Sequence, residues 1–177
     1  MLQHKVSSTN YPADMEDKLP AYFDTFGSTL RTNYGLDTSK TFYLSSAPQC
    51  PFPDASDPLS MLLICDFVWV QFYNNPPCEI GSSNFNNSIQ QWSTALNSST
   101  LNPKPRLYLG APAWSLAGYT AYEAIGSPEG MEAIAKSVED MQLVNFGGVM
   151  FWDGPEAVLN TEGGKDILGW TKAGLAQ

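Results

Sequence analysis

Four short runs of apolar residues divide the chain at fairly regular intervals. They cover residues 41–47, 67–73, 106–111 and 146–152. Each run is apolar almost throughout and does not alternate with polar residues, which is typical of strands in a parallel sheet that is covered on both faces. The four runs therefore predict four buried, parallel strands.

The segments between these runs carry apolar residues at helical spacing. One set is Phe85, Ile89, Trp92 and Leu96, and a second is Met131, Ile134, Val138 and Met141. A third helix is predicted over residues 15–30, with Leu19, Tyr22, Phe23 and Phe26 on one face and Pro20 expected to kink or split it. A last helical stretch includes residues 167–170, and residues 47–67 give the least regular pattern.

Strands that alternate with helices place the chain in the α/β class with a parallel sheet. The length of 177 residues, with 43% of them hydrophobic, is enough for one domain with a sizeable core. Periodicity alone leaves two architectures open, a doubly wound α/β domain and a fragment of a (β/α)8 barrel.

Charge and hydropathy argue against two classes of partner, nucleic acids and membranes. The net charge is -9 and only nine residues are Lys or Arg, without a clustered basic patch, so we expect no nucleic-acid partner. No apolar stretch reaches about 18 residues, so we expect no membrane-spanning segment. The first five residues lead directly into polar sequence, and we expect no signal peptide in this chain.

The chain has three cysteines and two glycosylation sequons. Cys65 follows an apolar run and is expected to be a buried free thiol. Cys50 and Cys78 each follow a strand-like run, and a bridge between them would imply an oxidising compartment, although the count alone does not establish the pair. The sequons begin at Asn86 and Asn97, and chance occurrence competes with use as glycosylation sites.

Polar and aromatic side chains gather where the predicted strands end. Gln71, Tyr73 and Asn74 close the second run, and Trp152 closes the fourth. The carboxyl ends of parallel strands are where ligands bind in α/β folds. An aromatic ring beside amides and hydroxyls suits a sugar, because the ring stacks on the apolar face of a pyranose while the polar groups bind its hydroxyls. The alternative is that Tyr73 and Trp152 are ordinary core aromatics.

Four segments in order resemble the second half of class III chitinases of glycoside hydrolase family 18. They are residues 47–54 (APQCPFPD), 68–78 (VWVQFYNNPPC), 107–113 (LYLGAPA) and 147–152 (GGVMFW). They look like the segment after the fifth barrel strand and then the sixth, seventh and eighth strands. The resemblance implies a partial TIM (β/α)8 barrel, approximately strands 5 to 8 with their helices, and residues 1–177 as a single domain fragment.

The resemblance also implies roles for individual residues. Family members hydrolyse β-1,4-linked N-acetylglucosamine with retention, and the 2-acetamido group of the substrate acts as the nucleophile. Tyr73 would bind the acetamido oxygen, Gln71 would contact the same sugar, and Trp152 would form the floor beneath it. The remaining substrate-binding positions would be Asn74, Ala111 and Met150. Neither a metal nor a cofactor is implied.

Two further features follow from the same resemblance. Cys50 and Cys78 match the disulfide of the family, and the peptide bond between Trp152 and Asp153 matches a non-proline cis bond of the family. The catalytic glutamic acid lies in an Asp-Gly-x-Asp-x-Asp-x-Glu motif that this sequence does not contain. Gln3 either occupies the position of that acid or belongs to unrelated sequence, and we favour the second interpretation.

Three functions remain open at this stage. The chain is a relative of an endochitinase that we expect to be inactive alone, a non-catalytic chito-oligosaccharide-binding protein, or a fragment without a ligand. The expected partner in the first two cases is chitin or its oligosaccharides, and the resemblance implies an extracellular location. Half a barrel would also leave one sheet face and two strand edges uncovered, so self-association is expected.

Overall fold

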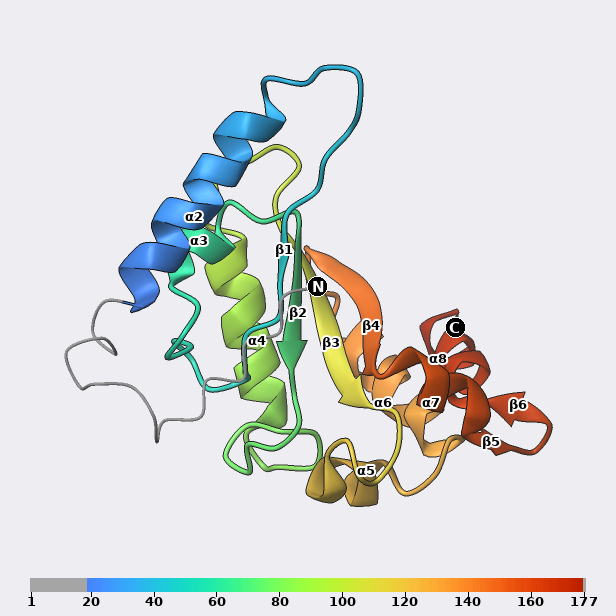
Figure 1. The fold of residues 1–177 in the computed structure, drawn as a ribbon. Helices are drawn as coiled ribbons and strands as arrows, with labels where there is room; N and C mark the ends of the chain where they lie inside the picture. Colours follow the sequence, from blue (N-terminus) through green and yellow to red (C-terminus); the bar gives the residue numbers. More distant parts are fainter. Residues whose placement is uncertain (1–18, 177) are drawn as a thin grey trace.

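The computed structural model describes residues 19–176. Its centre is a four-stranded sheet in the order β1-β2-β3-β4, and each neighbouring pair of strands is parallel. Figure 1 shows β2 and β3 pointing the same way, so that their carboxyl ends meet near α5. The predicted parallel α/β arrangement is therefore confirmed.

Three of the four strands closely follow the predicted runs. The strands are β1 (Ser45–Ser46), β2 (Phe67–Gln71), β3 (Arg106–Pro112) and β4 (Phe146–Trp152). The first was predicted too long, because only two residues of the run 41–47 pair with β2. The backbone N–H of Leu44 donates instead to the carboxylate of Asp66 at 2.7 Å, which interrupts the strand at that residue.

Alternation along the strands gives the sheet two different faces. The helix face consists of fully buried residues that point toward the packed helices: Val68, Val70, Leu107, Leu109 and Ala111. The opposite face, here called the open face, carries six partly exposed side chains: Phe67, Trp69, Gln71, Tyr108, Met150 and Trp152. Residues paired across parallel strands share a face, so the register assigns each set as one surface.

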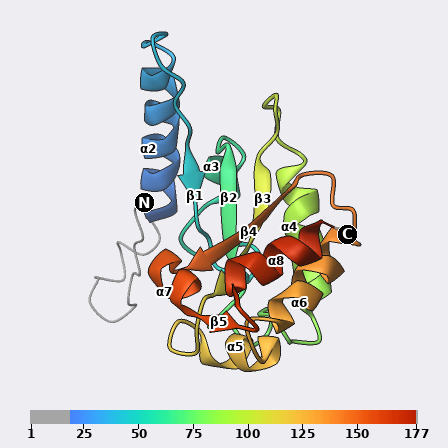
Figure 2. The same cartoon turned by 90° about the vertical axis from the view of Figure 1, so that its right-hand side faces the viewer.

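The helices that follow the strands supply the rest of the core. They are α3 (Leu59–Leu62), α4 (Phe85–Leu96), α5 (Tyr119–Ile125), α6 (Gly130–Glu139), α7 (Gly154–Leu159) and α8 (Ile167–Leu175). A two-stranded hairpin, β5 (Thr161–Glu162) with β6 (Lys165–Asp166), precedes α8. Figure 2 shows β4 crossing obliquely in front of the other strands, with α6 and α8 beside it. Ile89, Trp92 and Leu96 of α4 are fully buried, as their helical spacing predicts.

The first described helix is α2 (Leu19–Tyr34). Pro20 lies in its first described turn, where a proline is tolerated because the first turn needs no N–H from it. Residues 15–18 of the predicted helix lie outside the described residues, so the expected kink or split at Pro20 stays a prediction. The apolar face of α2 is shifted relative to the prediction. Tyr22 and Phe26 are exposed, whereas Gly27 is buried and approaches Met61 and Ile64 closely enough that a β-carbon would touch both side chains.

Candidate functional site

The predicted site residues at the carboxyl ends of the strands meet at one edge of the open face. The register pairs Gln71 with Gly110 and Gly110 with Met150, and it pairs Pro112 with Trp152. Tyr73 lies just beyond the end of β2, and a β-carbon on Gly118 would contact the β-carbons of both Tyr73 and Pro112, at 2.8 and 3.3 Å. Four predicted residues are thus brought together by three neighbouring strands: Gln71, Tyr73, Met150 and Trp152.

Tyr73 is the most unusual member of this group. Its side chain is only 3% exposed, and its hydroxyl is buried without a hydrogen-bond partner among residues 19–176. Burial raises the pKa of the phenol well above its usual range, so the group stays protonated at any physiological pH. A neutral, buried O–H donor that lacks an acceptor in the described residues is an unsatisfied polar group, which an acceptor from a ligand or a water would satisfy.

Gln71 and Asn74 are held by hydrogen bonds to neighbouring backbone. The amide of Gln71 donates to the carbonyl of Ala47 at 2.6 Å, which ties β2 to the segment after β1. Asn74 has a positive φ of 61°, a conformation that asparagine tolerates better than most residues. Its amide donates to the carbonyl of Ala117 at 3.1 Å and links the loop after β2 to the loop after β3.

Trp152 ends β4 on the open face and is partly exposed. Its carbonyl accepts from the backbone N–H of Ala113 at 2.9 Å, and its peptide bond to Asp153 is cis, as the resemblance implied. The carboxylate of Asp153 accepts from the N–H of Glu156 at 3.2 Å and caps α7. Asp153 therefore serves the start of a helix next to the tryptophan.

Ala111 lies on the wrong face of β3 for direct contact with a ligand beside Gln71. It pairs with Phe151 and is fully buried on the helix face. Strand alternation explains the error, because Ala111 is one residue away from the row of Gly110 and Pro112. Gln3, the other predicted position, lies outside the described residues.

A disulfide joins the loops that follow β1 and β2. Cys50 and Cys78 are bonded, with their Cα atoms 5.8 Å apart, and this is the pair that the resemblance implied. The carbonyl of Cys50 accepts from the indole of Trp92 at 2.9 Å and from the hydroxyl of Ser88 at 3.2 Å. The bridge is thereby anchored to α4. Cys65 is a buried free thiol whose pKa burial raises to about 12.

Glu79 and Gly118 were not singled out from the sequence. Glu79 is buried, exchanges hydrogen bonds with Asn75, and has one carboxylate oxygen without a partner in the described residues. A β-carbon on Gly118 would lie 2.8 Å from the β-carbon of Tyr73, so the loop after β3 packs directly against the tyrosine. Such close approaches depend on tertiary packing, and no periodic pattern in the sequence indicates them.

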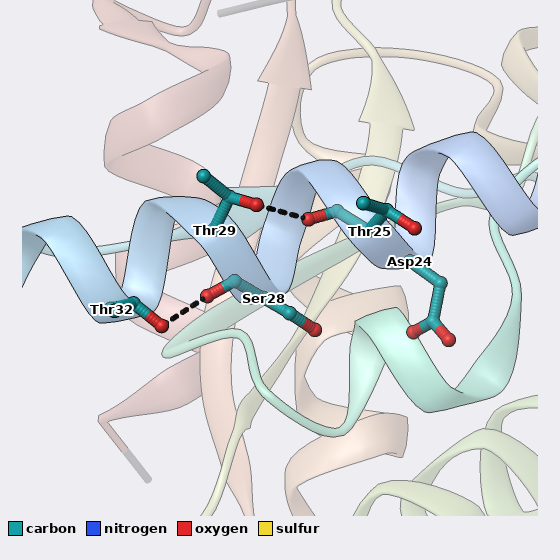
Figure 3. A pocket seen from close by; sticks show the side chains of 5 residues that line it. All are labelled: Asp24, Thr25, Ser28, Thr29 and Thr32. Atoms are coloured by element: carbon teal, nitrogen blue, oxygen red, sulfur yellow. Dashed lines mark hydrogen bonds between the residues drawn. The ribbon is translucent and has the colours of Figure 1, made fainter.

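Two hollows in the described structure are lined by other residues. One, of about 320 Å³, runs along α2 and is lined by Asp24, Thr25, Ser28, Thr29 and Thr32. Figure 3 shows that its lining comes from one helix face, where the hydroxyls of Thr29 and Thr32 donate to carbonyls of α2 itself. The other, of about 410 Å³, lies between Phe52 and the polar side of α4. Neither hollow contains a predicted site residue.

Other site types leave little trace in the described part of the chain. Between residues 19 and 176, His, Cys, Asp and Glu form no cluster of three or more that could hold a metal ion. Over the same residues, no helix combines the length and apolar character needed to cross a membrane.

Comparison with known proteins gives a consistent group of relatives. Endochitinase 3 of Metarhizium anisopliae is 38% identical over 130 residues, which cover 73% of this chain and 41% of the relative. Chitinase 3 of Candida albicans is 36% identical over 164 residues, which cover 90% of this chain and 27% of the relative. The chain thus spans less than half the length of these relatives. No protein-family model matches it.

Solved structures give the same picture of the fold. The chitinase ICChI of Ipomoea carnea matches with a TM-score of 0.57 and 31% identity, over 74% of this chain and 46% of that structure. A xylanase and α-amylase inhibitor protein in complex with trehalose matches with a TM-score of 0.65 and 25% identity, over 89% of this chain and 52% of that structure. Chitinases and an inhibitor protein therefore share this arrangement of strands and helices.

Proposed function

Because the chain is a homologue of the fungal and plant endochitinases, we propose that the carboxyl end of its sheet binds chito-oligosaccharides. The observation that carries this proposal is the buried hydroxyl of Tyr73, which has no hydrogen-bond partner in the described part of the chain. An unsatisfied buried hydroxyl costs about 1–3 kcal/mol, and the acetamido oxygen of N-acetylglucosamine would supply the missing acceptor. A neutral phenol is the correct partner for a neutral amide oxygen.

The neighbouring side chains support the same ligand. The partly exposed ring of Trp152 would stack on the apolar face of the sugar, and Met150 would extend this floor. Gln71 and Asn74 would contact the hydroxyl and acetamido groups at the sides. Ala111 would contribute only packing beneath this row, because its side chain faces the helices.

The architecture of the whole domain is the second part of the proposal. Four parallel strands with helical connections form half of an eight-stranded (β/α)8 barrel, and the open face is the interior of that barrel. The partly exposed aromatic side chains of Phe67, Trp69 and Tyr108 would then be interior residues. In a preparation of residues 1–177, we expect the open face to be covered by a second copy of the chain, so that the polypeptide self-associates.

The proposal for catalysis is that residues 1–177, taken alone, do not hydrolyse chitin. The chain contains no Asp-Gly-x-Asp-x-Asp-x-Glu motif, and the glutamine amide of Gln3 has no proton acidic enough to protonate a leaving group. The names of the chitinase relatives support chitin hydrolysis as the activity of the related full-length proteins, and the resemblance implies that the 2-acetamido group of the substrate assists it. A non-catalytic carbohydrate-binding protein is the second candidate, which the structural likeness to an inhibitor protein bound to trehalose favours.

An extracellular location completes the proposal. The Cys50–Cys78 bridge supports it, because structural disulfides persist mainly in oxidising compartments. The acidic net charge and the small number of basic residues suit a surface that meets neutral polysaccharide.

Removal of the Tyr73 hydroxyl tests sugar binding, because it should weaken the ligand affinity without lowering the free energy of unfolding. Titrating the chain with chitotetraose by calorimetry should show binding that Tyr73→Phe weakens roughly tenfold, because one buried hydrogen bond is lost. The same substitution should raise or preserve the free energy of unfolding without ligand, because it removes a buried hydroxyl that has no partner within residues 19–176. Trp152→Ala should abolish measurable binding. Equal affinity of Tyr73→Phe and the parent would contradict the proposed role of the hydroxyl.

Hydrolysis is tested separately with the same oligosaccharide. We expect no turnover by the chain or by Asp153→Asn, and chromatography of the products measures it. Robust turnover by the unmodified chain would show that another carboxylate acts as the acid. Turnover gained by Gln3→Glu would place Gln3 at the position of the acid.

A further inference from the structure

The segment around α4 contains no charged residue. Residues 80–103, which include this helix and both of its flanks, have no Asp, Glu, Lys, Arg or His among them. Surface helices normally carry charged side chains on the face that points away from the core. On α4 the buried side holds the large apolar residues, and the exposed side holds amides and a hydroxyl: Asn86, Asn87, Gln90, Gln91 and Thr94. These side chains can bind a partner through packing and hydrogen bonds but not through ion pairs.

A hollow of about 410 Å³ lies on the exposed side of this helix. Its lining consists of one aromatic ring and five residues of α4: Phe52, Asn87, Gln90, Gln91, Thr94 and Ala95. Asn87, Gln91 and Ala95 form one ridge of the helix, because each step of four residues returns to the same side. Gln90 and Thr94 form the neighbouring ridge. The hollow therefore follows the helix axis as a groove, and the polar groups along it repeat about every 6 Å.

The ring of Phe52 is fixed at one side of this groove. Phe52 is partly exposed, and its ring packs edge-to-face against the indole of Trp92, with the ring centroids 4.9 Å apart. Trp92 is fully buried, and its N–H donates to the carbonyl of Cys50 at 2.9 Å. The core thus holds the ring of Phe52 in place and leaves part of its surface free for a ligand, which reduces the entropy that binding costs.

Two amides of the groove are available to a ligand. The hydroxyl of Thr94 donates to the carbonyl of Gln90 at 2.9 Å, one turn earlier in the helix. The side-chain amides of Asn87 and Gln91 make no hydrogen bond to any residue between 19 and 176. Each of these amides offers two donors and one acceptor. The groove therefore combines an apolar ring with hydrogen-bonding groups of both kinds.

We propose that this groove is a carbohydrate-contact surface on the outside of the domain, which packs against a chain of a neutral polysaccharide. A pyranose has an apolar face for the ring of Phe52 and hydroxyls for the amides of Asn87 and Gln91. The uncharged segment around α4 matches an uncharged polymer. A protein partner suits the groove less well, because protein interfaces bury a core of several large apolar side chains and this groove offers one ring.

The groove is separate from the sugar site at the carboxyl end of the sheet. Phe85, Ile89 and Trp92 are on the buried side of α4, and the groove is on the opposite side of the helix. A chain held there would attach the domain to the surface of the polymer. The choice of chitin as this polymer rests on the proposed function. Solid chitin presents many parallel chains, so a contact too weak to hold one short oligosaccharide still adds to adsorption.

Adsorption to crystalline chitin tests the groove. The chain is prepared without N-glycans, and the protein left in solution is measured after mixing with increasing amounts of chitin. Asn87→Ala combined with Gln91→Ala should weaken adsorption roughly tenfold, because hydrogen bonds to the polymer are lost. The affinity for chitotetraose should stay within about twofold, since that ligand binds at the sugar site. Alanine suits an exposed helix position, so thermal unfolding should not shift downward.

Three further variants separate the ring, the helix surface and the sugar site. Phe52→Ala should weaken adsorption about as much as the double variant, and Phe52→Tyr, which keeps a ring, should adsorb as the parent does. The matched control is Asn33→Ala, which truncates an exposed amide on α2 and should change neither measurement. Trp152→Ala should still adsorb to chitin, and adding the two alanines of the groove to it should remove that adsorption.

The outcomes distinguish the groove from the sugar site. If the groove variants adsorb as the parent does, while Trp152→Ala loses chitotetraose, the groove is wrong and the sugar site stands. If the groove variants lose adsorption and chitotetraose binding equally, they act through the sugar site, and the groove is again wrong. Groove-dependent adsorption by a parent chain that does not bind chitotetraose would support the groove and overturn the sugar site. Adsorption to cellulose as strong as adsorption to chitin would overturn chitin as the occupant.

Discussion

The two faces of the sheet are built from the same strands, yet they differ in how completely they are packed. On the helix face, Val68, Val70 and Leu109 are fully buried beneath the helices. On the open face, Trp69 and Tyr108 alternate with them and stay partly exposed although their side chains are larger. Neighbouring residues of one strand therefore lie on opposite faces, one in a fully buried core and the other on a partly exposed surface.

We infer from this difference that the helix face provides stability and the open face provides function. The helix face holds the buried aromatic and aliphatic side chains and the anchored disulfide, so it should determine the free energy of unfolding. The open face ends in Gln71, Tyr73 and Trp152, so it should determine binding and association. Substitutions on the two faces should therefore affect different measurements.

The largest effect should come from matched tryptophan substitutions on the two sides. Trp92→Ala removes a fully buried indole that donates to Cys50, and it should lower the free energy of unfolding by about 3–5 kcal/mol. Trp69→Ala removes a partly exposed indole and should cost less than half as much. Urea denaturation measures both. If Trp92→Ala prevents folding, Trp92→Phe should show the same order with a smaller loss. Equal losses at the two positions would remove the distinction between the faces.

The second largest effect concerns the disulfide on the helix side. Cys50→Ser with Cys78→Ser opens a loop of 28 residues in sequence separation, and it should lower the free energy of unfolding by about 3 kcal/mol. The matched control is Cys65→Ala, which truncates the buried free thiol and should cost about 1 kcal/mol. Thermal unfolding of the three proteins measures the difference. A double variant as stable as the parent would show that α4 is held without the bridge.

The third prediction addresses the open face. Trp69→Gln places a polar side chain at the middle of this face, and it should weaken self-association of the 177-residue chain about tenfold, which corresponds to about 1.4 kcal/mol. Sedimentation velocity over a range of concentrations measures the change. Leu36→Gln, which alters an exposed leucine beyond α2, serves as the control and should have no effect. A monomeric parent chain would contradict the expectation of self-association.

The smallest effect should be electrostatic. Burial raises the pKa of Asp57, and this outweighs the hydrogen bond that its carboxylate accepts from Ser46. A raised pKa in the folded state means that the ionised carboxylate costs stability at pH 7, and the cost disappears as the pH falls through the folded pKa toward the ordinary value near 3.9. Asp57→Asn should therefore stabilise the chain by a few tenths of a kcal/mol at pH 7, and urea midpoints at pH 7 and pH 3.5 should show the gain shrinking.

Much of the fold could be predicted because it depends on local patterns. The apolar runs gave β2, β3 and β4, and the spacing of Ile89, Trp92 and Leu96 gave α4 and its buried face. The edge strand was overestimated, since the pairing of Leu44 depends on Asp66, 22 residues later in the chain.

Site residues could be predicted from the sequence only where they lie at the carboxyl ends of the predicted strands. Gln71, Met150 and Trp152 share one face because the register of three strands agrees with their spacing. Ala111 was misplaced by one residue, which is the smallest error that moves a side chain to the other face. Contacts such as Gly118 against Tyr73 join segments that no pattern connects, and they were found only in three dimensions.

The attachment of α4 to the disulfide determines when, during folding, the chain could be glycosylated at its first sequon. The first sequon, Asn86-Asn87-Ser88, lies in the first turn of α4, and its serine hydroxyl is buried against the carbonyl of Cys50. An enzyme that must reach both the asparagine and the hydroxyl would find the second one covered in the finished fold. Closure of this helix over the bridge would therefore end the period in which the nascent chain could receive a glycan there.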